Sequence, residues 1–216
     1  AAQIYATYVN ATVGITTEIN TNVYGQVVQT AASGSGFVIS QDGYIVTNYH
    51  VIEDASAIKV TLYDGTSYPA TLVGGDEEND IAVLKIAATG LTPVVIGSSD
   101  ELVVGEPVYA IGNPLGELTF SLTGGYVSAL NRNVTMSDGR RMNYIQTDTA
   151  INSGNSGGAL FNQYGQVVGI VSAKLSSSGS STSASVEGIG FAIPIDDVKD
   201  MITDLIQYGY ITGQPY

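Results

Sequence analysis

Short segments in which apolar or β-branched residues alternate with polar ones follow one another along most of this chain. Alternation of this kind predicts half-buried β-strands. The expected strands are Thr12–Glu18, Gly36–Ser40, Tyr44–Thr47, Ala57–Tyr63, Tyr68–Val73, Ile81–Ile86, Val94–Ile96, Pro107–Ile111, Thr119–Leu130, Arg141–Asp148, Ala159–Asn162, Val167–Ala173 and Gly188–Ile193. Turn-forming pairs such as Asp64-Gly65 stand between them, and the 26 glycines suit many tight turns. A dozen short strands at this spacing predict an all-β fold, either one closed barrel or a pair of barrels.

Two segments have the pattern of a helix instead. Ala2–Val9 is short and apolar, and Asp196–Tyr208 has apolar residues at helical spacing, with Asp196 as a candidate N-cap. The polar segment Gly97–Gly105 has no strand pattern, so we expect it to be the seam between two halves. The tail Gly209–Tyr216 has the composition of a linker.

Composition excludes several classes of function. The net charge is −13 with only seven basic residues, so the chain lacks the cations that nucleic-acid binding needs. There is no cysteine, which rules out disulfides, a thiolate nucleophile and zinc–thiolate sites, and with one histidine a polyhistidine zinc site is impossible. We therefore expect no metal and no cofactor. No apolar run reaches the roughly 18 residues that a membrane span requires.

The segment Gly154-Asn155-Ser156-Gly157-Gly158 carries the clearest chemical signal. Glycines on both sides of a serine allow a sharp bend, in which consecutive backbone N–H groups converge near the hydroxyl and can stabilise an oxyanion. An ordinary turn is the alternative interpretation, because Gly-Ser-Gly runs are common in turns.

Two further residues complete a possible catalytic set. His50 stands at the expected end of an apolar strand, and Asp80 abuts the apolar segment Ile81–Leu84. Taken singly, His50 could be structural and Asp80 could belong to a solvated acidic turn. Together with Ser156 they supply a nucleophile, a base and a carboxylate that orients the base, in the chain order His, Asp, Ser that is typical of chymotrypsin-like enzymes.

Five spaced segments extend this pattern. They are Thr47-Asn48-Tyr49-His50-Val51-Ile52, Asn79-Asp80-Ile81-Ala82-Val83-Leu84, Ile111-Gly112-Asn113-Pro114-Leu115-Gly116, Gln146-Thr147-Asp148-Thr149-Ala150-Ile151-Asn152-Ser153-Gly154-Asn155-Ser156-Gly157-Gly158 and Gly188-Ile189-Gly190-Phe191-Ala192-Ile193-Pro194. From about residue 10 to the end, the chain resembles the protease domain of the HtrA/Deg serine proteases. The resemblance implies an all-β, chymotrypsin-like fold of two six-stranded barrels, with a short N-terminal helix, a C-terminal helix and the active site between the barrels.

The resemblance also implies a division of the chain and a role for each site residue. We expect residues 1–98 to form the first barrel, 99–195 the second, and 196–216 a helix and linker toward a PDZ domain that this sequence does not contain. By position, His50 is the general base, Asp80 orients it and Ser156 is the nucleophile. The backbone N–H groups of Gly154 and Ser156 are the expected oxyanion donors.

The expected substrate-binding residues also follow from the resemblance; they are Ala150, Ile151, Asn152, Ser153, Ser172, Ala173 and Lys174. No carboxylate stands near Ala150 to favour basic side chains, and Ile151 is apolar, so we expect small or medium aliphatic residues before the cut. Ordinary core packing of Ile151 is the alternative. The stretch Ser172–Lys174 is expected to pair with the substrate as an added strand, which requires unfolded substrates.

Asn155 stands where trypsin-like zymogens have an aspartate that pairs with a new N-terminus. An uncharged side chain cannot form that pair, so activation by cleavage is not expected. HtrA-like enzymes order or disorder their active-site loops instead. The matching segments are Gly112–Thr119, Ala150–Ser153 and Lys174–Gly188. The last contains the serine-rich stretch Leu175–Val186, whose composition predicts a mobile, solvated loop.

The resemblance extends to assembly and location. Ile4, Tyr5, Tyr8 and Val9 resemble the aromatic-rich segment through which family members form homotrimers, although core packing is an alternative explanation. The family's habit implies an extracytoplasmic protein, periplasmic or at a bacterial cell surface, with any membrane anchor upstream of Ala1. The expected partners are unfolded proteins or peptides. Two other hypotheses stay open at this point: a catalytically silent chaperone or peptide-binding module on the same fold, and an all-β adhesin.

Overall fold

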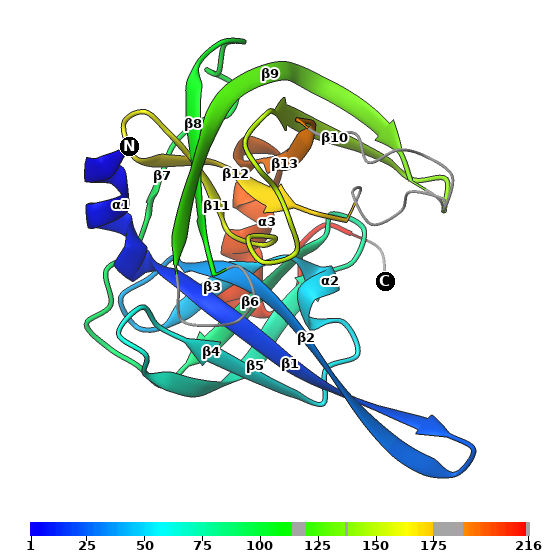
Figure 1. Ribbon diagram of the computed structural model, residues 1–216. Helices are drawn as coiled ribbons and strands as arrows, with labels where there is room; N and C mark the ends of the chain where they lie inside the picture. Colours follow the sequence, from blue (N-terminus) through cyan, green and yellow to red (C-terminus); the bar gives the residue numbers. More distant parts are fainter. Residues whose placement is uncertain (114–119, 137, 175–187, 215–216) are drawn as a thin grey trace.

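The alternating segments form two β-sheets in the computed structural model, which describes residues 1–113, 120–136, 138–174 and 188–214 (Figure 1). The serine-rich stretch Leu175–Val186, and most of the expected loop segments Gly112–Thr119 and Lys174–Gly188, lie outside the described residues.

The first sheet is a closed barrel of six antiparallel strands in the order β1-β2-β3-β6-β5-β4. Its strands are β1 (Thr12–Val23), β2 (Gln26–Val38), β3 (Tyr44–Thr47), β4 (Ala57–Thr61), β5 (Ser67–Asp76) and β6 (Ile81–Ile86). β4 pairs with β1 and closes the ring. The predicted all-β architecture is therefore confirmed.

The second sheet has seven strands in the order β11-β8-β9-β10-β13-β12-β7. They are β7 (Val95–Ile96), β8 (Pro107–Gly112), β9 (Ser121–Thr135), β10 (Arg141–Thr147), β11 (Ala159–Asn162), β12 (Gln166–Ser172) and β13 (Gly190–Pro194). Because β11 also pairs with β12, six of these strands form a ring, and β7 is attached to β12 as a parallel neighbour.

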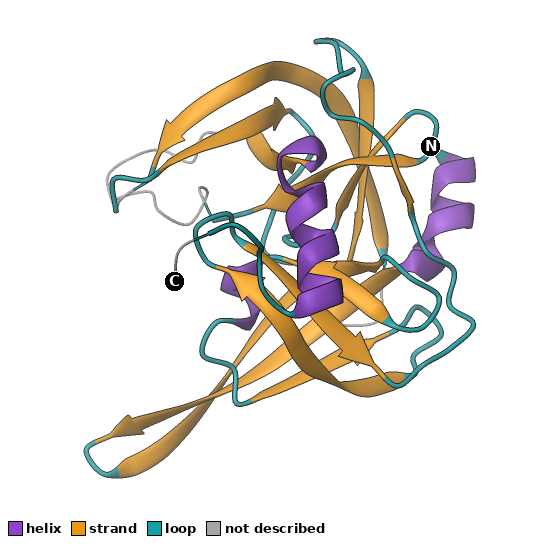
Figure 2. Cartoon of the chain, turned by 180° about the vertical axis from the view of Figure 1, so that it is seen from behind, coloured by secondary structure: helices purple, strands orange, loops and turns teal. Residues whose placement is uncertain are grey.

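The helices are few and lie at the chain ends and beside the site. They are α1 (Ala2–Tyr8), a 3₁₀ turn (Val9–Ala11), α2 (Tyr49–Ile52) and α3 (Ile195–Tyr208). α3 packs against β5 and β6 of the first sheet and against β12 and β13 of the second, so it spans the junction on the side seen in Figure 2. None of the helices among the described residues is long and apolar enough to cross a membrane.

Strand β6 explains how the two barrels adhere. Ala82 and Leu84 point into the first barrel, whereas Ile81 and Val83 belong to a second apolar cluster that includes residues of both sheets, α1 and α3. Successive side chains of a strand face opposite sides, so a strand with both faces covered reads as a continuous apolar run. The sequence Ile81–Leu84 is continuously apolar because both faces of β6 are buried.

The hairpin of β1 and β2 is longer than the sequence pattern predicts. Both strands continue beyond the barrel and pair in register as far as Val23 and Gln26, forming the arm at the lower right of Figure 1. The turn at its tip uses Tyr24 and Gly25, both with positive φ, as a two-residue hairpin turn requires. The outer part of β2 was missed because its side chains are exposed and show no alternation.

Asp196 is not the N-cap of α3, as the sequence suggested; the cap is Pro194, and Asp196 lies in the first turn. Its carboxylate instead accepts hydrogen bonds from Ser98 Oγ (2.7 Å) and the Asp100 N–H (2.8 Å), and pairs with Lys199 Nζ at 2.8 Å. Burial opposes ionisation of Asp196, but the hydrogen bonds from Lys199, Ser98 and Asp100 outweigh it and hold its pKa well below the usual range. This carboxylate therefore ties α3 to the polar segment between β7 and β8.

Replacing Asp196 with Asn should lower the free energy of unfolding by about 1–3 kcal/mol at neutral pH, because charge-assisted hydrogen bonds are lost. The melting temperature should fall by roughly 2–10 °C. Since the folded-state pKa is depressed, the stabilisation is present above the unfolded pKa and is lost as the pH falls below about 4. The difference in melting temperature should therefore narrow in acid. Asp200→Asn, an exposed carboxylate on the same helix, is the control and should change little.

Candidate active site

His50 lies just after the end of β3, as the sequence suggested, but within a short helix that the sequence did not predict. β3 ends at Thr47, and the short helix α2 presents the imidazole toward the junction of the two barrels. The apolar neighbours Val51 and Ile52 are buried in the first barrel, and this packing holds α2 in place.

Asp80 ends a tight turn directly before β6 and is 1% exposed. It has φ +55, in the left-handed region that aspartate tolerates better than most residues. One carboxylate oxygen, Oδ2, lies 2.7 Å from His50 Nδ1, and the other, Oδ1, accepts the backbone N–H of His50 at 2.9 Å. Two hydrogen bonds from one residue fix the orientation of the carboxylate.

Ser156 lies within a turn, residues 153–157, that packs against β2 of the first barrel. Its backbone carbonyl accepts the N–H of Ser35 on β2 at 2.9 Å, and Ser35 Oγ donates to the Gly154 carbonyl at 2.6 Å. Gly157 has φ +88, and a Cβ there would collide with the Ser35 carbonyl and the Thr47 hydroxyl, so only glycine fits. Gly157 of the motif is thus required by the close approach of β2.

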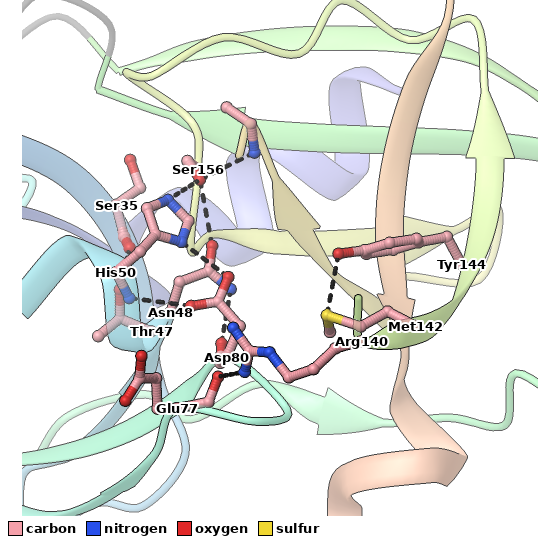
Figure 3. Close-up of polar contacts among 11 residues, drawn as sticks. Ser35, Thr47, Asn48, His50, Glu77, Asp80, Arg140, Met142, Tyr144 and Ser156 are labelled. Atoms are coloured by element: carbon pink, nitrogen blue, oxygen red, sulfur yellow. Dashed lines mark hydrogen bonds and ion pairs between the residues drawn. The ribbon is translucent and has the colours of Figure 1, made fainter. Parts of the chain in front are cut away.

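These three residues, which the sequence proposed as a set, lie together across the junction (Figure 3). Ser156 Oγ is 3.2 Å from His50 Nε2. A carboxylate only accepts hydrogen bonds, so the proton between His50 and Asp80 resides on Nδ1 and leaves Nε2 as an acceptor. The arrangement can therefore transfer a proton from the serine hydroxyl to the imidazole.

Asn48 also contacts the nucleophile, although the sequence did not single it out. Its Nδ2 donates to the Asp80 carbonyl at 3.0 Å, so its Oδ1 must face Ser156 Oγ, 3.1 Å away. The Ala173 N–H donates to the same hydroxyl oxygen at 3.0 Å. The serine proton thus has two acceptors, His50 and Asn48. The position of Asn48 in the same motif as His50 was the only sequence feature that could have pointed to this contact.

Tyr144 is buried in the second barrel, with its hydroxyl donating to Met142 Sδ at 3.2 Å (Figure 3). Burial, and next the nearby Asp80 charge, raise the pKa of Tyr144 to about 12. The phenol therefore stays neutral and adds no second charge beside Asp80.

The two expected oxyanion donors are occupied within their own loop. The Gly154 N–H donates to Asn152 Oδ1 at 2.8 Å, and the Ser156 N–H donates to the Asn152 carbonyl at 3.1 Å. Asn155 helps to hold this shape, because its Oδ1 accepts the Asn152 N–H at 2.9 Å and its Nδ2 donates to the Ala150 carbonyl at 2.9 Å. In this conformation, Asn152 occupies the donors that an oxyanion would use.

A cleft of about 530 Å³ lies over Ser156 and His50. Of the expected substrate-binding residues, Ser153, Ala173 and Lys174 line it, and Ala150, Ile151, Asn152 and Ser172 do not. The opposite wall was missed; it consists of Ala32, Ser33 and Val51. Among the described residues, no group of three or more His, Cys, Asp and Glu side chains is placed to hold a metal ion.

Ile151 is half-buried and packs on the core of the second barrel. Its side chain lies over Gly190, where an added Cβ would stand 2.5 Å from Ile151 Cγ1. The glycine therefore leaves the space that this side chain fills.

Comparisons with known proteins agree with the geometry. A family model for the trypsin-like peptidase domain matches residues 34–170. "Serine protease Do-like HtrA" of Bacillus subtilis is 47% identical over 194 residues, covering 86% of this chain and 42% of that protein. "Protease Do-like 1, chloroplastic" of Arabidopsis thaliana is 46% identical over 184 residues, covering 83% of this chain and 40% of that protein.

A solved structure of an HtrA-type protease with a decapeptide superposes with a TM-score of 0.86 at 33% identity, covering 97% of this chain and 68% of that one. The chain spans less than half the length of the two curated relatives. The match to the peptidase family and the similarity to Do-like and HtrA-type proteases agree on one assignment: the chain belongs to the HtrA family of serine proteases and carries their trypsin-like peptidase domain.

Proposed function

We propose that this protein is a serine endopeptidase in which Ser156 is the nucleophile, His50 the general base and Asp80 the residue that orients His50. The observation that carries the proposal is the continuous hydrogen-bond chain from Ser156 Oγ through the imidazole to the buried Asp80 carboxylate. An adhesin would not require a serine, a histidine and a buried aspartate in one hydrogen-bond chain.

The chemistry would follow from these contacts. Ser156 Oγ attacks the carbonyl carbon of a peptide bond while its proton passes to His50 Nε2, and Asp80 stabilises the imidazolium that results. His50 then gives the proton to the leaving amine, which frees one product and leaves an acyl-enzyme. Water, deprotonated by the same imidazole, attacks the acyl carbon and releases the second product and the serine hydroxyl.

We also propose that the N–H groups of Gly154 and Ser156 stabilise the oxyanion once Asn152 has released them. The two donors are adjacent to the nucleophile, and the hydrogen bonds that occupy them come from a single exposed residue. Productive binding would thus require a rearrangement of residues 152–154, consistent with the loop ordering that the family resemblance implies.

The proposed substrates are unfolded or misfolded proteins, in a role in quality control outside the cytoplasm. A substrate strand would lie along Ala173 and Lys174 in the cleft, and a folded chain cannot supply an extended segment. A relative from Chlamydia trachomatis carries the name "Probable periplasmic serine endoprotease DegP-like", which supports the location. A homotrimer remains a proposal from the resemblance, since Ile4 and Val9 pack within the chain's own core.

For specificity, we propose that Ile151, which does not line the cleft in this conformation, bounds an apolar pocket for the side chain before the cut once residues 152–154 have rearranged. The described residues that line the cleft include no acid and one cation, Lys174, so a basic side chain would gain no counter-charge there. Burying an unpaired charge costs several kcal/mol, whereas an aliphatic side chain gains about 25 cal/mol per Å² of apolar area buried.

Digestion of a fully unfolded protein should therefore give products cut mainly after Val, Ala, Leu or Ile, by about a hundredfold over Lys and Arg, which corresponds to about 3 kcal/mol. Mass spectrometry of the products reads the sites directly. The same substrate in its folded state should resist, and Ser156→Ala should give no cuts at all.

Ile151→Phe should shift the sites toward smaller side chains. If the cleavage sites did not change, Ile151 would belong to the core and would not form part of the pocket. Products cut mainly after Lys and Arg would overturn the pocket while leaving the catalytic set untouched. Cutting that persists in Ser156→Ala would overturn the proposed function itself, and an intact wild type that binds but never cuts the unfolded chain would favour the silent chaperone.

A further inference from the structure

A hairpin of the second barrel reaches back to the turn that carries Asp80. The hairpin consists of β9 and β10, and Arg140 stands immediately before β10. Its Nη1 donates to the backbone carbonyl of Glu77 at 2.9 Å, which is a contact from one barrel to the other (Figure 3).

The acceptor of this bond also holds Asp80. The Glu77 carbonyl receives the backbone N–H of Asp80 at 3.3 Å, so Arg140 binds the oxygen that closes the turn. Asp80 adopts a left-handed conformation, which persists only when the surroundings impose it. The 3.3 Å bond is long, so the turn depends on its other contacts.

Arg140 is itself held in place. Asp138 Oδ2 lies 2.6 Å from both Nε and Nη2 of Arg140, which leaves Nη1 directed at Glu77. A planar guanidinium loses little freedom when held by such a fork. The contact therefore joins a donor held by Asp138 to the carbonyl that accepts the Asp80 N–H.

We propose that Arg140 is a positioning residue that acts through the Glu77 carbonyl to hold Asp80 in place for His50. The inference rests on the proposed function, because it assigns Arg140 to that catalytic set. Arg140 does not line the cleft over Ser156; it lines a separate hollow of about 300 Å³ with Glu78 and Asn79. Its effect should therefore appear in kcat and not in KM.

The test compares Arg140→Met, which removes the donors, with Arg140→Lys, which keeps a cation and a donor. Arg140→Met should lower kcat by about 10–100-fold with KM nearly unchanged, the scale expected when a catalytic group is displaced. Arg140→Lys should recover most of the loss. Arg141→Met, the exposed neighbour of the same chemistry, is the control and should leave both constants within about twofold.

A second readout does not depend on activity. The chain has one histidine, so the far-downfield proton resonance of the His50–Asp80 hydrogen bond needs no assignment. It should weaken or shift in Arg140→Met, remain in Arg140→Lys and be unchanged in Arg141→Met. If the wild type shows no Ser156-dependent hydrolysis, the proposed function fails while this resonance still tests the positioning.

Should Arg140→Met fail to fold, Asp138→Asn serves in its place, because it loosens the fork without removing the guanidinium. It should shift the resonance and lower kcat in the same direction by a smaller factor. An unchanged resonance and an unchanged kcat in Arg140→Met, or an equal loss in Arg141→Met, would overturn the proposal.

Discussion

Replacing Ser156 with Ala should lower kcat by about 10⁴–10⁶, and replacing His50 with Ala should cost almost as much. The reason is that the two side chains act as a unit: the hydroxyl is a poor nucleophile unless Nε2, 3.2 Å away, takes its proton. The double variant should lose little more than either single one. Single-turnover hydrolysis of an unfolded substrate measures the rates.

An organophosphonate probe provides the control for this pair. It should label the wild type and fail to label Ser156→Ala, even when that variant is fully folded. More than a few per cent of residual activity in Ser156→Ala would show that another group is the nucleophile. Strictly additive losses in the double variant would show that Ser156 and His50 do not act as a unit.

Asp80→Asn should lower kcat by about 10⁴, and the contacts of Asp80 explain why. The His50 backbone N–H can only donate, so it takes the single oxygen of the new amide, and the NH₂ then faces Nδ1. Nδ1 must become the acceptor, which moves the imidazole proton to Nε2. In that tautomer His50 cannot accept the proton of Ser156.

Nitrogen NMR of the single histidine should report this change of tautomer directly. Glu78→Gln, an exposed carboxylate two residues away, is the control and should keep both the tautomer and the rate. A larger loss in Glu78→Gln than in Asp80→Asn would mean that the wrong carboxylate had been assigned.

For three largely buried strands, the sequence pattern predicted the strand to the residue, whereas the prediction for the equally buried β12 is displaced by one residue. β3, β6 and β11 begin and end where the pattern predicts. The outer half of β2 carries no such pattern, because its hydrogen bonds to β1 alone make it a strand. α2 was missed for a different reason: it is one turn long and is held by packing of Val51 and Ile52, which an apolar strand would bury equally well.

The same distinction applies to the site. His50, Asp80 and Ser156 could be proposed because each stands in a short motif whose neighbouring residues form the local turn or helix that holds it. The cleft wall of Ala32 and Ser33 could not, because it depends on how β2 lies against the turn that carries Ser156. The sequence also could not show that the Gly154 and Ser156 N–H groups are already hydrogen-bonded. That depends on the conformation of the loop, which directs both N–H groups at Asn152.

The hydrogen bonds of Asn152 have a consequence for how the protein meets its ligands. If the donors are filled in most molecules at rest, any ligand that needs them binds only to the fraction whose loop is open, and its apparent affinity falls by that fraction. A loop open in about one molecule in a hundred would weaken every such ligand about a hundredfold. The affinity of a ligand then depends in part on the fraction of molecules whose loop is open. Any change that breaks the Asn152 hydrogen bonds would therefore tighten binding, even if the ligand makes no new contact in the cleft.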